Sequence, residues 1–296
     1  MMAGIILQGK TGQEEIDRAL VGLVGLFVEA FPGRIHSAYL VGSRADGSAL
    51  PSSDIDLRIV FRANFLLGEE GRFFEVRQYL RSISRFELDC PPLSQDRLMQ
   101  AEDWLHETIA IKEVSIFLYG TDLRPFLPPL PSLPVFTRHI SRAPIIFMRK
   151  VRRGALVLRY PLDFPSAAGP FFGYDTSQSL KLLVQIPGFI ASALLAMQAG
   201  QMVTRKSDWL PLYRQYIHDR WLPLLEDLNR IVRQDWEYRL PETEEDRQVL
   251  LELCRQVLAF ENYYLEQYQQ YLRLELASGI AYRRAVALER LAEVKY

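Results

Sequence analysis

Two neighbouring stretches, YLVGSRADGS at residues 39–48 and SDIDLRIV at residues 53–60, decide how the chain is interpreted. Polar and apolar residues alternate from Asp54 to Ile59 in the second stretch, which is the pattern of a β-strand. Because alternate side chains of a strand lie on the same face, Asp54, Asp56 and Arg58 share one face. Two carboxylates so placed repel each other unless a cation lies between them. A hard cation such as Mg²⁺ prefers oxygen ligands of this kind, so Asp54 and Asp56 are candidate metal ligands.

Gly42 and Ser43 directly follow the apolar run of the first stretch, and ten residues separate Ser43 from Asp54. A glycine at the end of a strand lets a phosphate approach the backbone, and a serine hydroxyl and amide can bind a phosphate oxygen. The next residue, Arg44, is expected either to contact a triphosphate or to cap a surface turn. The two stretches together predict a phosphate-binding turn beside a metal site.

These residues resemble the signature of the nucleotidyltransferase superfamily, whose domain has the DNA polymerase β-like fold. That signature is an apolar residue, Gly, Gly or Ser, a spacer, and then Asp, apolar, Asp, apolar. The sequence of the segment is most similar to those of the minimal and the aminoglycoside nucleotidyltransferases. The resemblance implies transfer of a nucleoside monophosphate from an NTP, usually ATP, to a hydroxyl, with release of pyrophosphate. It also implies two Mg²⁺ ions held by three carboxylates.

The third carboxylate is expected from a later strand beside the one that carries the two aspartates. Residues 85–90, RFELDC, supply Glu87 and Asp89 on one face. In small nucleotidyltransferases an apolar-Asp-apolar strand runs into a Leu-Ser pair, which favours Asp89 as the metal ligand. In aminoglycoside adenylyltransferases a glutamate of the corresponding strand acts as the base toward the acceptor hydroxyl. Glu87 is therefore the alternative ligand or the base.

A further phosphate contact is implied by the same resemblance in the second half of the chain. Residues 200–207, GQMVTRKS, resemble the segment of aminoglycoside adenylyltransferases in which a lysine contacts the nucleotide phosphates. Lys206 is the candidate for this contact. The nucleotide-binding set expected from the sequence is therefore Gly42, Ser43, Arg44 and Lys206.

The order of the expected elements indicates an α/β domain followed by an all-α domain. In the first half we expect helices at Glu14–Phe31 and Gly71–Ile83, and strands at Ser37–Val41, Ile55–Phe61, Arg85–Cys90 and Val114–Tyr119. The α/β nucleotidyltransferase domain, a small mixed sheet with helices, is placed at residues 1–124. A proline-rich connector at 125–143 is expected to be extended and stiff. A helical domain at 144–296 is expected to select the acceptor or to form a dimer.

Composition excludes several classes of protein. The chain has 296 residues, 49% of them hydrophobic, with a formal net charge of −1. Such a balance is typical of a globular protein and gives no global positive field for binding nucleic acid or an anionic membrane. The most apolar window, residues 180–200, contains a lysine, a proline and two glutamines, so we expect a buried helix there and not a membrane span. We expect a cytoplasmic protein with no membrane partner.

Three functions are compatible with these observations. The leading hypothesis is a metal-dependent nucleotidyltransferase that modifies a small hydroxylated molecule, with aminoglycosides as the closest analogy. A second hypothesis keeps the donor chemistry and changes the acceptor to a protein or a tRNA, as in toxin–antitoxin systems. A third is a nucleotide-binding module without catalysis. The aromatic, Leu-rich helices near the end of the chain also indicate a possible homodimer.

Overall fold

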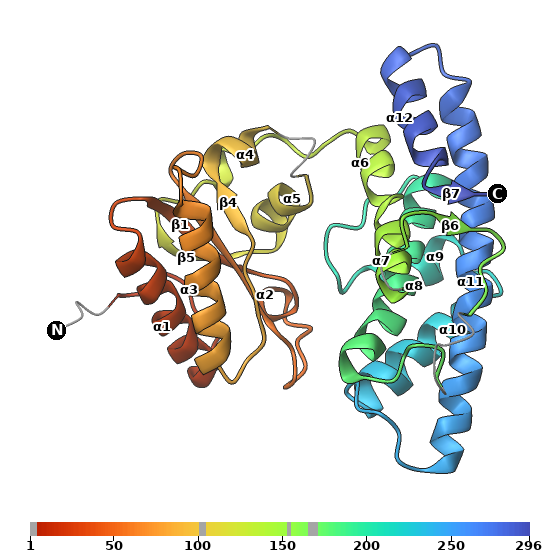
Figure 1. Ribbon diagram of the computed structural model, residues 1–296, viewed down its shortest axis with the longest axis horizontal. Helices are drawn as coiled ribbons and strands as arrows, with labels where there is room; N and C mark the ends of the chain where they lie inside the picture. Colours follow the sequence, from red (N-terminus) through yellow and green to blue (C-terminus); the bar gives the residue numbers. More distant parts are fainter. Residues whose placement is uncertain (1–4, 101–104, 153–154, 165–170) are drawn as a thin grey trace. The chain divides into compact units, whose positions relative to one another are not determined.

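The computed structural model describes residues 5–100, 105–152, 155–164 and 171–296, and it divides into two compact units (Figure 1). The first unit comprises Met1–Pro131 together with the short segment Thr204–Ser207. The second comprises Ser132–Val203 and Asp208–Tyr296. Each unit has its own hydrophobic core, as expected when one chain forms two domains.

The first unit is built on a five-stranded mixed sheet in the strand order β3-β2-β1-β5, with β4 also paired to β2. Strand β1 is antiparallel to both β2 and β5, whereas β3 and β4 run parallel to β2, one after the other along the same edge. The strands are β1 (Ile35–Val41), β2 (Ile55–Phe61), β3 (Leu88–Asp89), β4 (Pro92–Ser94) and β5 (Ile116–Gly120). The helices are α1 (Glu14–Ala30), α2 (Ser43–Asp46), α3 (Glu69–Ile83), α4 (Gln95–Met99) and α5 (Leu105–Val114), with a 3₁₀ turn at Arg124–Phe126.

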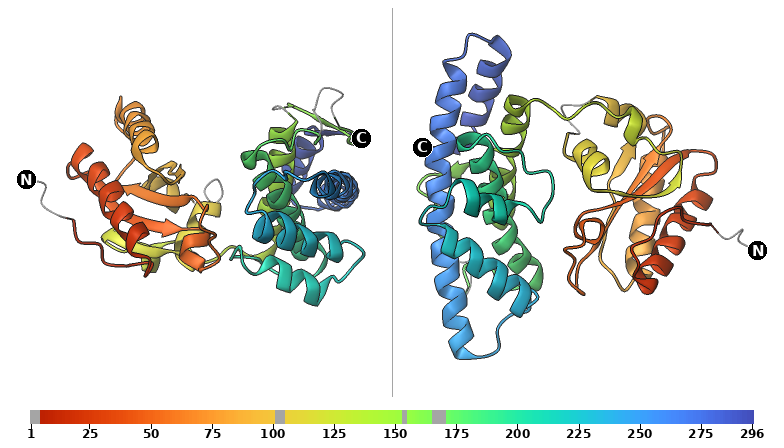
Figure 2. Two further views of the ribbon diagram at one scale, coloured as in Figure 1. Left: turned by 90° about the horizontal axis from the view of Figure 1, so that it is seen from below. Right: turned by 180° about the vertical axis from the view of Figure 1, so that it is seen from behind.

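Strand β2 separates two kinds of side chain onto the two faces of the sheet. Its odd-numbered residues, from Ile55 to Phe61, are buried in a core with α1 and α3, which lie side by side on that face (Figure 2). Its even-numbered residues point to the other face, where Val60 packs in a smaller core with Leu98 of α4 and Ile111 of α5. Asp54, Asp56 and Arg58 therefore lie on the face that carries α4 and α5, as the alternation predicts.

The prediction of a strand over Arg85–Cys90 is mostly wrong. Only Leu88 and Asp89 pair with β2, and the edge continues as a separate strand that begins at Pro92. The two consecutive prolines that follow Cys90 lack backbone N–H donors, so a continuous ladder cannot pass through them. The sequence analysis also missed the short helices α2 and α4 and the longer helix α5.

The second unit is mostly helical. Its elements are α6 (Leu133–Ile140), α7 (Ala143–Val151), β6 (Leu158–Arg159), α8 (Ser177–Gln198), α9 (Trp209–Tyr216), α10 (Leu222–Asp227), a π-helical segment (Leu228–Asp235), α11 (Glu244–Leu276), α12 (Ala281–Leu291) and β7 (Val294–Lys295). The predicted fold class, a mixed sheet with helices followed by a mostly helical region, is confirmed. The expected extended connector is in fact partly helical, because a 3₁₀ turn lies at its start and helix α6 forms inside it. Pro134 is in the first turn of α6, where its missing N–H costs nothing.

Helix α8 covers most of the apolar window and is the central helix of the second unit. It begins with a capping box in which Thr176 and Ser179 exchange side-chain and backbone hydrogen bonds. Among the described residues it is the one helix long and apolar enough to cross a membrane, and 72% of that window is buried inside the structure. This burial agrees with the expected core helix.

Candidate functional site

Three of the predicted acidic residues lie side by side on neighbouring strands. In the register of the sheet, Asp56 of β2 pairs with Val41 of β1 on one side and with Asp89 of β3 on the other. Residues directly opposite each other in a sheet present their side chains to the same face, so Asp56 and Asp89 are neighbours there. Asp54 lies on the same face, just before β2 begins. The fold thus brings Asp54, Asp56 and Asp89 together.

The structure treats Glu87 and Asp89 differently. Asp89 is part of β3, and its carboxylate is close enough to Asp56 to raise the pKa of that residue. Glu87 precedes β3 and its side chain is exposed, although its carbonyl accepts a hydrogen bond of 2.8 Å from the amide of Ile55. This arrangement favours Asp89 as the third acidic residue of the cluster and leaves Glu87 at its solvent-facing margin.

Asp56 carries the most unusual protonation behaviour of the cluster. Burial raises its pKa to about 7, and the charges of Asp54 and Asp89 act in the same direction. Arg58 and Lys206 oppose this shift without cancelling it. An aspartate in such surroundings is ionised at neutral pH only in part, and any added positive charge would favour the ionised form. A bound cation is one way to supply that charge.

Gly42 lies directly against Asp56. Its backbone has φ +71°, and a Cβ atom at this position would lie 2.1 Å from Oδ2 of Asp56. Such a distance is far below any van der Waals contact, and the positive φ is itself unfavourable for residues other than glycine. The position therefore requires glycine for two independent reasons. Ser43, buried, begins the short helix α2 immediately after it.

Arg44 is held inside the unit and is not directed at solvent. Its guanidinium donates to the carbonyls of Asp54, at 3.1 Å, and of Ser53, and it lies 5.2 Å from the ring centroid of Phe86. Burial lowers the pKa of Arg44, while the charges of Asp54 and Asp56 raise it. These contacts fix the loop that delivers Asp54 to the site. They favour turn capping over contact with a triphosphate.

Sequence reasoning missed one residue of this network, Glu107 of helix α5. The guanidinium of Arg58, whose side chain is 5% exposed, lies between Glu107 at 2.5 Å and Asp89 at 3.1 Å. Burial alone would lower the pKa of Arg58, but the two carboxylates outweigh burial and raise it. The signal in the sequence is Arg58 itself, because an arginine on a covered strand face requires a carboxylate partner. The identity of that partner depends on where α5 packs.

Lys206 joins the same site from a distant part of the sequence. The segment Thr204–Ser207 belongs to the first unit although the helices on both sides of it belong to the second. Within that unit the ammonium of Lys206 lowers the pKa of Asp56, which shows that its charge acts on the acidic cluster. The side chain is exposed and makes no ion pair among the described residues. It is thus free to meet an anion beside Asp56.

The donor set fits a hard divalent cation. The carboxylates of Asp54 and Asp56 make no hydrogen bond or ion pair with any described residue, although each raises the local negative charge. No three His, Cys, Asp or Glu side chains of the described ranges are gathered tightly enough to hold an ion alone, and Asp89 is paired with Arg58. Two aspartates plus oxygens from a bound phosphate are the donor set that Mg²⁺ uses in phosphoryl-transfer sites. Asp54 and Asp56 would hold such an ion, with Asp89 beside them.

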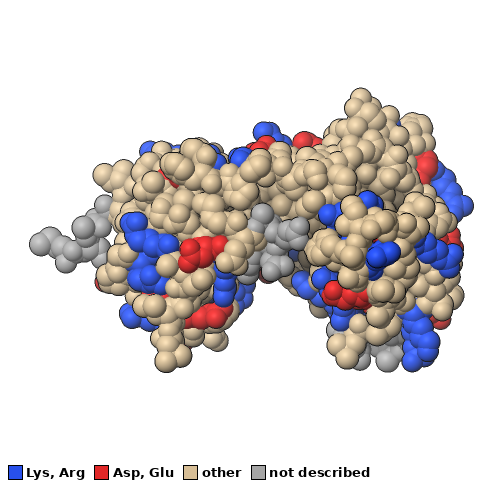
Figure 3. All heavy atoms as spheres, turned by 90° about the horizontal axis from the view of Figure 1, so that it is seen from above, with Lys and Arg blue, Asp and Glu red and all other residues tan. Residues whose placement is uncertain are grey.

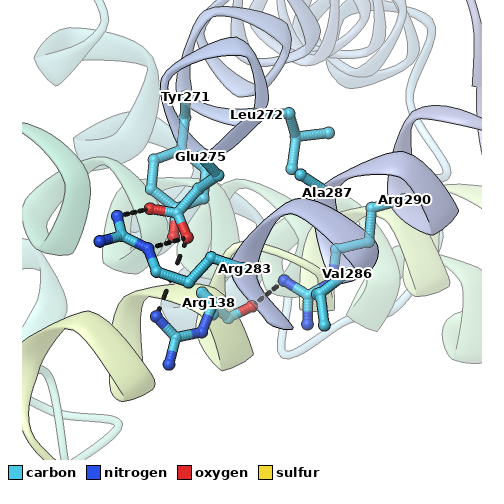
Figure 4. Close-up of a pocket in the computed structure, with 8 residues that line it drawn as sticks. All are labelled: Arg138, Tyr271, Leu272, Glu275, Arg283, Val286, Ala287 and Arg290. Carbon is cyan, nitrogen blue, oxygen red and sulfur yellow. Dashed lines mark hydrogen bonds and ion pairs between the residues drawn. The ribbon is translucent and has the colours of Figure 1, made fainter. Parts of the chain in front are cut away.

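The helical unit contains a second cluster of charged residues, whose members contact one another. The cluster lines a crevice between α6, α11 and α12 in which Arg138 and Arg283 both pair with Glu275, and Arg290 donates to the carbonyl of Arg138 (Figure 4). These contacts join three helices, with three arginines sharing one glutamate and one backbone carbonyl. On the face drawn in Figure 3, basic and acidic residues are interspersed, which agrees with the near-zero net charge and offers no extended basic surface there.

Comparison with known proteins agrees with this geometry. Residues 23–111 match the family model described as the nucleotidyltransferase domain. Among solved structures, the chain is similar to a spectinomycin adenyltransferase from Enterococcus faecialis, crystallised with ATP and spectinomycin. The TM-score is 0.50 at 12% identity, and the match covers 81% of this chain and 98% of that chain. At this identity the likeness shows a shared fold. A search of curated protein sequences finds no match.

Proposed function

We propose that the protein moves a nucleoside monophosphate from ATP to a hydroxyl of a small acceptor, with the match of residues 23–111 to the nucleotidyltransferase domain as the premise. The acceptor class that we propose is aminoglycoside-like, and pyrophosphate is the second product. One observation carries the proposal: Asp54, Asp56 and Asp89 share one face of the sheet, with Gly42 against Asp56. The fold shared with an adenyltransferase solved with ATP and a small acceptor supports both the donor and the acceptor class.

In the proposed reaction, the acceptor hydroxyl oxygen bonds to the α-phosphorus of ATP as the bond from that phosphorus to pyrophosphate breaks. Asp54 and Asp56 would hold the divalent cation, which would supply positive charge to the triphosphate and make the acceptor hydroxyl more acidic. We assign the acceptor proton to Glu87, whose exposed carboxylate lies at the margin of the cluster. Gly42 leaves room for the Asp56 carboxylate directly beside the turn. The backbone and hydroxyl of Ser43, which follows it, would bind a phosphate oxygen.

Lys206 is proposed to neutralise phosphate charge. We expect Lys206→Met to weaken the binding of a non-hydrolysable ATP analogue by roughly ten- to a hundredfold, because a charge-assisted hydrogen bond contributes about 1.5–3 kcal/mol. Isothermal titration calorimetry in the presence of Mg²⁺ measures this loss. The adjacent Arg205→Met is the matched control, since it removes one exposed positive charge from the same segment. Equal weakening by the two substitutions would show that only general charge matters here.

The transfer reaction is tested with ATP labelled at the α-phosphate. We expect label to appear on one or more members of a panel of aminoglycosides and spectinomycin, with one pyrophosphate released for each labelled product. Wild type is compared with Asp54→Asn, which should give no product. Label on a protein or a tRNA in the same assay would move the acceptor to that class. Mg²⁺-dependent ATP binding without transfer to any acceptor would leave a nucleotide-binding module.

A further inference from the structure

The ion pairs of Arg58 place a fixed positive charge beside the acidic cluster. Its side chain is almost fully buried, and its Nη1 and Nε atoms contact Oδ2 of Asp89 and Oε2 of Glu107 at 3.1 Å and 2.5 Å. Nη1 also lies 3.4 Å from the carbonyls of Leu57 and Asp89. The guanidinium is therefore held from two directions, by strand β3 and by helix α5.

Arg58 could instead reach Asp56. The two residues are two positions apart on β2 and lie on the same face, which places their Cα atoms about 7 Å apart in a strand. A guanidinium has several donors in a fork that fits carboxylate oxygens, so these oxygens suit it as well as they suit a divalent cation. Arg58 is thus an internal competitor for the oxygens that the proposed function gives to the metal ion.

The contact with Glu107 determines whether the guanidinium of Arg58 lies against Asp89 or against Asp56. Its side chain is 13% exposed and comes from α5, outside the sheet, so it draws the Nε side of Arg58 away from β2. It also compensates the buried positive charge, which would otherwise seek the nearest remaining carboxylates. Asp54 and Asp56, in contrast, make no ion pair with any described residue. The observed arrangement keeps Arg58 on Asp89 and leaves the two aspartates free.

We propose that Glu107 is a positioning residue that holds Arg58 against Asp89 and so keeps the guanidinium off the metal-binding oxygens of Asp54 and Asp56. This inference rests on the proposed function, since it concerns the same acidic cluster. Helix α5 thereby affects metal binding indirectly, through the contact of Glu107 with Arg58 and not through a ligand to the metal. Loss of Glu107 would convert Arg58 from a support of the site into an inhibitor of metal binding.

The experiment measures Mn²⁺ binding by electron paramagnetic resonance, with the metal alone and with a non-hydrolysable ATP analogue. In Glu107→Leu we expect the Mn²⁺ affinity to fall by roughly tenfold or more, the size of effect typical of residues that orient metal ligands. In the double variant Arg58→Leu/Glu107→Leu the competitor is gone, and we expect affinity to return to near the wild-type value. Glu113→Leu removes one negative charge from the same helix and is the control, with no expected change.

This rescue separates positioning from a merely structural role. If Glu107 only stabilised the packing of α5, the double variant would bind Mn²⁺ as weakly as Glu107→Leu, and that result would overturn the inference. Unchanged affinity in Glu107→Leu would overturn it as well. Should thermal unfolding show that Glu107→Leu does not fold, Glu107→Gln, alone and combined with Arg58→Leu, tests the same contrast with the shape of the side chain retained.

A different variant, Asp56→Asn, tests whether the acidic cluster is the metal site that the proposed function requires. If Asp56→Asn binds Mn²⁺ as wild type does, the acidic cluster is not the metal site, and both proposals fail. If Asp56→Asn loses Mn²⁺ while Glu107→Leu keeps it, the metal site stands and only the role of Glu107 is rejected.

Discussion

Asp56→Asn is expected to abolish Mg²⁺-dependent binding of an ATP analogue and, at the same time, to raise the melting temperature of the metal-free protein at pH 8. The loss of binding follows because the substitution removes one of the two unpaired carboxylates proposed to hold the ion. The gain in stability follows because burial and Asp54 raise the pKa of Asp56 to about 7 in the folded state. A neutral amide of the same shape avoids the cost of ionising a group in these surroundings.

The pH dependence of this gain has a definite sign. The pKa of an unfolded aspartate is about 3.9, below the folded value, so the folded protein binds the proton more tightly. The contribution of Asp56 to stability is therefore complete below about pH 4 and is lost as the pH rises through about 7. Above that pH the ionised form costs on the order of a few kcal/mol, which corresponds to a shift of roughly 5–10 °C in melting temperature for a domain of this size.

Thermal unfolding from pH 4 to pH 9, without and with Mg²⁺, tests both the loss of metal binding and the pH-dependent gain in stability. The difference between Asp56→Asn and wild type should vanish at the acid end and grow toward pH 8, and Mg²⁺ should stabilise wild type alone. Glu29→Gln, at an exposed position of α1, removes one negative charge from a helix on the opposite face of the sheet from Asp56 and should show neither effect. A stability difference that is constant with pH would contradict the shifted titration of Asp56.

The parts of the fold that were predicted well have strict local patterns. Strand β2 begins and ends at the residues expected, Ile55 and Phe61, because polar and apolar residues alternate up to Ile59 and the apolar run continues to Phe61. Helix α1 differs from the expectation by one residue at its end, since its apolar residues recur at helical spacing up to a Pro-Gly pair. Patterns of this kind depend on the chain itself and need no knowledge of distant contacts.

The parts that were missed depend on contacts between distant residues. The sequence places Glu87 and Asp89 on one face but gives no register, and it is the pairing of Ile55 with Leu88 that sets Asp89 beside Asp56. Glu107 was overlooked for the same reason, because only the packing of α5 on the sheet brings it to Arg58. Sequence patterns identified the types of residue in the site, and the tertiary fold decides which of them meet.

A second large effect is expected at Gly42. Gly42→Ala should destabilise the fold by roughly 1–3 kcal/mol, because the backbone at φ +71° and ψ −156° lies in a region that is essentially restricted to glycine. The new methyl group would also overlap Oδ2 and Cγ of Asp56, at 2.1 and 2.8 Å. The Asp56 carboxylate makes no hydrogen bond with a described residue that would resist its movement. We therefore expect the side chain to be displaced at small further cost to stability, but with a severe loss of Mg²⁺-dependent binding of the ATP analogue.

Gly47→Ala separates strain from displacement. Gly47 lies at the other end of helix α2 with φ +80°, and a Cβ atom there would meet nothing within 4 Å. Gly47, with ψ +6°, has the left-handed helical conformation, which strains alanine less, so Gly47→Ala should lower the melting temperature by a smaller amount. Calorimetry should show lost nucleotide binding only for Gly42→Ala. Equal binding by the two variants would mean that the contact between Gly42 and Asp56 does not govern the site. Loss of binding in Gly42→Ala alone would show that nucleotide binding depends on the position of the Asp56 carboxylate. The glycine of the turn would then be required because it leaves space for an aspartate of the neighbouring Asp-apolar-Asp strand.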